Sequence, residues 1–235
     1  MLQTALATGA ALVALAFSMS TFERWLARRR RHELAWSVAL LQFSLASAAL
    51  AAGAGLGWNG TWFRLFYLFG AITNVPFLAL GTVYLLGGDR RGDVWAAVVA
   101  LLAAFAAGVL TMAPFTAPIP RDTLPQGSEV FGALPRVMAA VASGVGATVI
   151  IVGAAWSAWR FRRGRMLWAN VLIALGTTIT GMSGLLNSVM DEMDGFAVTL
   201  TVGITVIFAG FLVANASERT AQRLRPVKPG AGAAA

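Results

Sequence analysis

The feature that most constrains this chain is a run of 24 residues, Leu65 to Gly88, without a charged side chain. About 20 apolar residues are enough for a helix to cross the hydrocarbon core of a bilayer. Similar runs recur along the chain, and only 12% of its residues are charged, against about 25% in soluble domains. The sequence therefore predicts an all-α polytopic membrane protein.

Seven apolar runs are long enough to be transmembrane helices, and together they predict one membrane domain over residues 1–216. Segment 114–135 contains five prolines and is expected to be a loop, because proline interrupts a helix. The basic tail, 217–235, is expected to be disordered. The predicted spans are 2–22, 34–57, 62–87, 94–112, 136–159, 166–190 and 196–216.

The basic residues predict an orientation. With the N-terminus outside and the C-terminus in the cytoplasm, 15 of the 18 lysines and arginines face the cytoplasm, where cationic loops are retained. The expected cytoplasmic segments include the loop Glu23–Glu33 and the turn Asp89–Asp93. Such loops attract anionic headgroups, so membrane lipids are expected partners. The chain has 17 arginines and one lysine, and together with its many alanines this composition suggests a GC-rich bacterial genome. The expected location is therefore the cytoplasmic membrane of a bacterium.

Several function classes are disfavoured by composition. Nucleic-acid binding does not fit, because the basic residues lie in short loops between apolar runs. There is no cysteine for a disulfide or thiolate, and the single histidine, His32, cannot form a bis-histidine haem site. The string Gly181–Gly184 matches the GxSG of rhomboid proteases, but no span carries a histidine to activate its serine. We therefore expect no cofactor, and enzymatic activity is the less favoured reading.

A faint internal repeat accompanies the seven spans. The first and fifth spans are each followed by an arginine-rich turn, which fits three spans, a linking span and three more spans. This layout resembles that of sugar facilitators of the SWEET family and of microbial rhodopsins. The resemblance covers topology alone. A rhodopsin also needs a lysine within the membrane, whereas the one lysine here, Lys228, lies in the tail.

Polar residues in two spans are candidate ligand contacts. Thr180, Asn187 and Asp191 share a face of the sixth span, where they either assist helix packing or line a cavity that opens outward. In the third span, Asn74 follows Arg64 on one predicted stripe. The Asn74 amide needs a partner in hydrocarbon, either the Ile72 carbonyl that Pro76 leaves unbonded or a ligand.

Charges on the predicted outer side run against the positive-inside trend. Arg64, Arg121 and Arg136 face five carboxylates there, so they either form salt bridges with the outer loop or bind an anionic group at a substrate mouth. The carboxylates Asp191, Glu192 and Asp194 are weak candidates for a metal site, because no EF-hand pattern surrounds them.

Two functions from different classes follow. The favoured one is a protein that binds a small solute or lipid, or facilitates its passage, through an outward-facing polar cavity. The spans carry no carboxylate at mid-depth, so a facilitator fits better than a proton-coupled pump. The alternative is a non-catalytic accessory or scaffold subunit of a larger membrane complex or homo-oligomer, favoured by the abundant alanine and glycine and the short loops.

The predicted topology can be tested with reporters. A reporter fused after Arg225 should lie in the cytoplasm, and tags at Asp122 and at Asp194 should be accessible from outside. A carboxy-terminal reporter that is found outside would overturn both the number of spans and the orientation.

Overall fold

Helices make up most of the described part of the chain. The computed structural model describes residues 2–160, 168, 171–173, 175–179, 198–199, 201–210 and 213. Within these ranges no β-strand is formed, and five helices are long and apolar enough to cross a membrane. The predicted spans 166–190 and 196–216 are described only in part, and 201–210 form a shorter apolar helix. Seven spans and their topology therefore remain a prediction.

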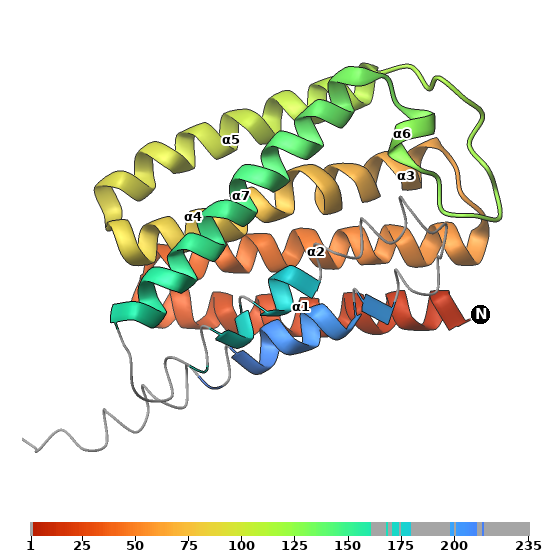
Figure 1. Cartoon of the computed structure of the whole chain (residues 1–235). Coiled ribbons are helices and arrows are strands. Elements are labelled where there is room, and N and C mark those ends of the chain that lie inside the picture. Colours follow the sequence, from red (N-terminus) through yellow and green to blue (C-terminus); the bar gives the residue numbers. More distant parts are fainter. Residues whose placement is uncertain are drawn as a thin grey trace, which may run out of the picture.

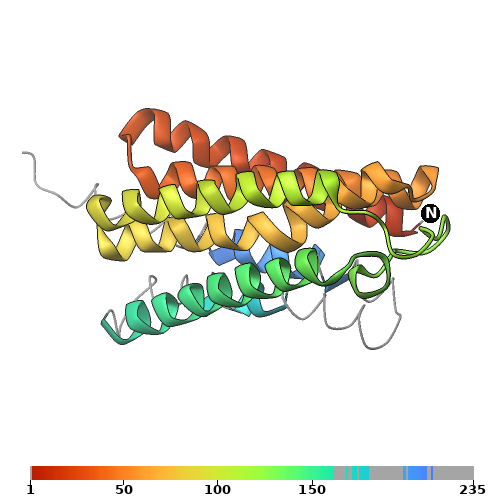
Figure 2. The same cartoon turned by 90° about the horizontal axis from the view of Figure 1, so that it is seen from above.

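The long helices are stacked side by side. In Figure 1, α1, α2, α4 and α5 follow one another across the bundle, and α7 crosses them. Figure 2 shows α4 between α2 and α7. The elements are α1 (Leu2–Arg28), α2 (Arg31–Leu56), α3 (Gly60–Phe66), the π-helix η1 (Tyr67–Thr73), α4 (Asn74–Gly87), α5 (Asp89–Met112), α6 (Gly127–Val130) and α7 (Ala133–Arg160).

The helices continue into segments that the sequence predicts to be loops. α1 runs to Arg28 and α2 begins at Arg31, so the expected loop Glu23–Glu33 is reduced to Arg29 and Arg30. Arg29 takes a positive φ of 52°, which reverses the chain within two residues. Likewise Asp89–Asp93 is the start of α5 rather than a turn, and Gly88 alone separates α5 from α4, with a φ of 79°. Both helix pairs are therefore tight hairpins.

α2 is the most enclosed of the five candidate spans. In its most apolar stretch of 18 residues, about 56% is buried inside the bundle, against 17% in the corresponding stretch of α5. Hydroxyl groups join it to α1, since Ser44 Oγ donates to the Ala11 carbonyl at 2.9 Å and Ser18 Oγ donates to the Ser37 carbonyl at 2.8 Å. Such hydrogen bonds between helices replace the contacts with water that a bilayer does not offer. α1 and α2 are therefore held together by hydrogen bonds from side chains to backbone carbonyls.

A π-helical turn interrupts the third span. Pro76 has no backbone N–H for the Ile72 carbonyl, and the wide turn η1 lies directly before it. Thr73 Oγ1 donates to the Leu68 carbonyl at 2.9 Å, and Ser143 Oγ on α7 donates to the Ala71 carbonyl at 2.6 Å. The carbonyls of the widened turn thus find partners in side chains, and one of these partners comes from a neighbouring helix.

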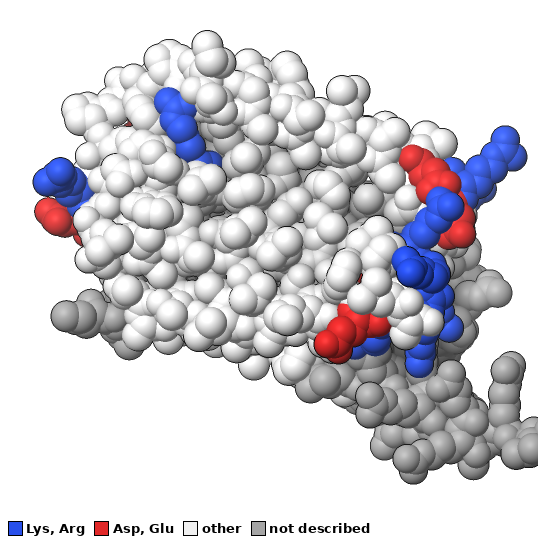
Figure 3. Space-filling model, turned by 180° about the vertical axis from the view of Figure 1, so that it is seen from behind, with Lys and Arg blue, Asp and Glu red and all other residues white. Residues whose placement is uncertain are grey.

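Charged side chains gather at the two ends of the bundle. Figure 3 shows charged groups at both ends of this face and a broad uncharged band between them. We call the end with Arg28–Arg31, Arg90 and Arg91 the arginine end. The opposite end, with residues 113–132 and the N-terminus, is the loop end (Figure 1). A band of this kind is consistent with an integral membrane protein.

Close packing at Gly53 gives a stability prediction. A Cβ atom at this position would lie 2.6 Å from the buried Trp58 ring. Gly53→Ala should therefore destabilise the protein by about 1–3 kcal/mol, because either the ring or α2 must shift. The melting temperature in detergent measures the effect. Gly108→Ala is the control, since its Cβ would meet nothing within 4 Å. Equal melting temperatures for the two variants would contradict this packing.

Candidate functional site

Arg64 caps the end of a neighbouring helix. From α3, its guanidinium donates to the carbonyls of Leu110, Thr111 and Ala113, the latter two at 2.8 Å. It also lies over the Phe115 ring, 4.3 Å from the centroid. The last carbonyls of a helix have no partner within the helix and carry a partial negative charge. The contacts that the structure gives Arg64 are therefore intramolecular and hold the C-terminus of α5.

The Asn74 amide binds the backbone of a neighbouring helix. Its side-chain Nδ2 donates to the Ala39 carbonyl on α2, at 2.7 Å. The backbone partner is thus not the Ile72 carbonyl that the sequence suggested. Asn74 opens α4 directly after η1, where its side chain extends across to α2 rather than back along its own helix. Its amide is one of the polar links between the third span and α2.

Of the other predicted site residues, the structure describes Arg136. Arg136 is exposed in the first turns of α7. Within the described residues no group of three or more His, Cys, Asp or Glu side chains is placed to hold a metal ion. The other predicted site residues, Thr180, Asn187, Asp191, Glu192 and Asp194, lie outside the described part of the chain.

Aromatic rings fill the loop end. Phe63 and Phe131 stack with centroids 5.2 Å apart, and both are buried, at 0% and 1% exposure. Tyr67 packs on Phe131 at 5.0 Å, and Trp58 packs edge-on against Phe63. The proline-rich loop packs on these rings. Within it, the Thr116 backbone N–H donates to the Val130 carbonyl at 2.9 Å, next to Phe131. Sequence reasoning missed this aromatic cap, although Trp58, Phe63 and Tyr67 lie within ten residues.

A polar network closes the arginine end. Arg31 on α2 forms a salt bridge with Asp93 on α5 and lies 3.9 Å from Asp89. The Tyr84 hydroxyl donates to the same Asp93 carboxylate at 2.9 Å. The three interactions join α2, α4 and α5, and they engage both carboxylates at the start of α5. The sequence placed these residues at the same membrane surface but did not pair them.

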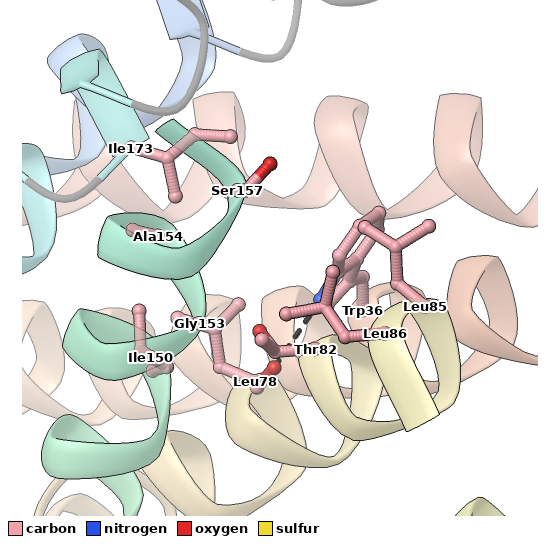
Figure 4. Close-up of a pocket in the computed structure, with 10 residues that line it drawn as sticks. All are labelled: Trp36, Leu78, Thr82, Leu85, Leu86, Ile150, Gly153, Ala154, Ser157 and Ile173. Carbon is pink, nitrogen blue, oxygen red and sulfur yellow. Dashed lines mark hydrogen bonds between the residues drawn. The ribbon is translucent and has the colours of Figure 1, made fainter. Parts of the chain in front are cut away.

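A small cavity lies between α2, α4 and α7, near the arginine end. Its volume is about 60 Å³, and Figure 4 shows the side chains that surround it. Trp36 forms one wall, and its Nε1 donates to the Leu78 carbonyl at 3.2 Å. The lining residues are Trp36, Leu78, Thr82, Leu85, Leu86, Ile150, Gly153, Ala154, Ser157 and Ile173.

The lining determines what the cavity can hold. None of the ten side chains is charged, and Thr82 and Ser157 supply its hydroxyl groups. A water molecule occupies about 10–15 Å³ on this measure of volume, so about four to six methylene-sized groups would fit. Cavities walled by apolar groups remain free of water and accept hydrocarbon. The geometry therefore suits a short stretch of an alkyl chain and not an ion.

The sequence carried a weak signal for this cavity. Gly153 and Ala154 lie side by side in α7, opposite the leucines of α4. Small residues in a span are usually packing positions, so their sequence does not distinguish a filled interface from a hollow one.

Comparison with known proteins adds no assignment. No protein family, no curated protein and no solved structure matches this chain.

The capping role of Arg64 can be tested by mutation. Arg64→Met should cost about 1–3 kcal/mol, because it removes the side-chain donors of three carbonyls at the end of α5. Arg64→Lys should recover part of that loss, since one ammonium can still bind carbonyls. The unfolding free energy in mild detergent is the measurement. If Arg64→Met leaves this free energy unchanged, the cap does not stabilise the fold.

The hydrogen bond of Asn74 gives a second prediction. Asn74→Leu should destabilise the protein by about 1–3 kcal/mol, because the Ala39 carbonyl then lacks its side-chain donor. Pro76→Ala should not relieve that loss, since the acceptor is on α2. A double-mutant cycle measures the coupling. Full rescue by Pro76→Ala would instead identify the Ile72 carbonyl as the partner that matters.

Proposed function

We propose that this chain is an integral membrane protein that binds the hydrocarbon chain of a lipid, or of a similar hydrophobic solute, from within the bilayer. The observation that carries this function is the uncharged cavity between α2, α4 and α7. Its size suits a few methylene groups, and its walls offer no charged group to recognise an ion. Lipid is the most abundant source of such chains around the bundle.

An outward-facing polar path has less support among the described residues. The aromatic cap fills the loop end, where Phe63 and Phe131 are buried. Arg64 and Asn74, two residues that would have lined such a path, donate hydrogen bonds to backbone carbonyls. These contacts favour binding of an apolar ligand over passage of a polar solute.

The accessory-subunit function has one observation in its favour. Only 17% of the most apolar stretch of α5 is buried inside the bundle, and Leu101 and Phe105 on this helix are exposed. In a scaffold subunit, a partner helix would cover this face. In a lipid-binding protein, bulk lipid would cover it. The two functions therefore differ in which surface a bound molecule protects.

The proposed function predicts where a photoreactive lipid will react. Ala154→Leu should fill the cavity and reduce crosslinking of a diazirine-bearing fatty acid to α4 and α7 at least severalfold. Ala155→Leu is the matched control, because the neighbouring residue is exposed and does not line the cavity. Peptide mass spectrometry of the crosslinked protein gives the readout.

Two results would count against this function. Equal crosslinking in Ala154→Leu and Ala155→Leu would mean that the label samples the surface of the bundle and not the cavity. Protection of α5 peptides by a co-purifying membrane protein, without labelling at the cavity, would favour the accessory subunit.

A further inference from the structure

The cavity lies close to the arginine end, which is rich in positive charge. Trp36 is five residues from Arg31 on α2, which is about 7.5 Å along a helix. Leu86, another lining residue, is four residues before Arg90. The headgroup of a lipid at the arginine end could therefore lie among arginines while one of its chains reaches the cavity.

Arg91 lies against the same end of α4. A Cβ atom built on Gly87 would be 3.5 Å from Arg91 Cδ, so the aliphatic part of Arg91 packs over the residue that follows Leu86. Arginine commonly covers apolar surface with its stem while its guanidinium stays at the polar boundary. The stem of Arg91 thus packs on the end of α4 that follows the lining residue Leu86.

The nearby carboxylates leave this positive charge available. Asp93 forms a salt bridge with Arg31, and Asp89 lies 3.9 Å from the same guanidinium. Arg90 and Arg91 are exposed and form no ion pair with a described residue. Among the described side chains, the arginine end carries seven arginines, Arg24, Arg28–Arg31, Arg90 and Arg91, against four carboxylates, Glu23, Glu33, Asp89 and Asp93.

We propose that the ligand of the cavity is an anionic phospholipid, with one acyl chain between α4 and α7 and its phosphate at Arg90 and Arg91. This inference rests on the proposed function and adds the class of the headgroup. The apolar lining fits the acyl chain, and the surplus of positive charge at the arginine end fits the phosphate. A zwitterionic lipid fills the same cavity but gains less from the arginines, because its headgroup has no net charge.

Lipid titration of the purified full chain tests the headgroup. Native mass spectrometry should find that dioleoyl phosphatidylglycerol binds on the order of tenfold more tightly than dioleoyl phosphatidylcholine, given two nearby cations. The variant Arg90→Gln, Arg91→Gln should bring the two affinities to within about twofold. Its affinity for phosphatidylcholine should fall much less, because the chain site is intact and the zwitterionic headgroup gains less from the arginines. Higher salt should narrow the difference in the wild type.

A matched double variant controls for the loss of two charges. Arg121→Gln, Arg136→Gln removes two exposed arginines at the loop end and should retain the wild-type preference for phosphatidylglycerol. If this variant loses the preference and Arg90→Gln, Arg91→Gln retains it, the phosphate binds at the other end and the inference is overturned.

The two proposals fail in different ways. If wild type binds both lipids equally and Ala154→Leu weakens both, the chain site stands and the anionic headgroup is wrong. If Ala154→Leu weakens neither lipid while Ala155→Leu behaves like wild type, the cavity holds no chain and both proposals fall. If the preference persists in Ala154→Leu at undiminished affinity, the arginines attract lipid without the cavity, which also overturns the inference.

Discussion

The arrangement of this bundle depends on partners for the backbone carbonyls of one span. A bilayer offers no water to an unbonded carbonyl, so the break before Pro76 must be satisfied by protein groups. Side chains meet this demand around η1, where Ser143 of α7 binds the Ala71 carbonyl. In the same region, Asn74 binds the Ala39 carbonyl of α2. These bonds draw α2 and α7 onto the third span.

The cavity follows from those fixed points. Beyond η1, α4 continues for about four turns between α2 and α7, and bulky residues give way to small ones on α7. Gly153 lets Thr82 approach, since a Cβ built there would lie 2.5 Å from the threonine methyl group. Leu86 lies on the same side, 3.2 Å from the same Cβ position, and Ala154 also lines the cavity. A hollow with apolar walls therefore forms at the arginine end, where the surrounding surface is most basic.

Much of the architecture could be predicted from the sequence, because the length of an uncharged run and the positions of prolines act locally. Five spans and the irregular loop at 113–132 follow from these features. The predicted stripe that placed Arg64 and Asn74 on one helix face does not match the structure, because it assumed 3.6 residues per turn throughout. The wide turn of η1 changes that register, so Arg64 contacts the end of α5 while Asn74 contacts α2. The cavity and the Arg31–Asp93 pair depend on residues distant in the chain, which local patterns do not join.

The link between Arg64 and α5 has a consequence for how the protein enters the membrane. α4 and α5 are joined by Gly88 alone, so they are a helical hairpin from the moment both are made. The carbonyls that receive Arg64 belong to the second arm of that hairpin, 46 to 49 residues later in the chain. Until that arm is synthesised, the guanidinium has to remain hydrated or be held by the insertion machinery. We expect the two arms to leave the translocation channel together, with the arginine joining them as they release into lipid.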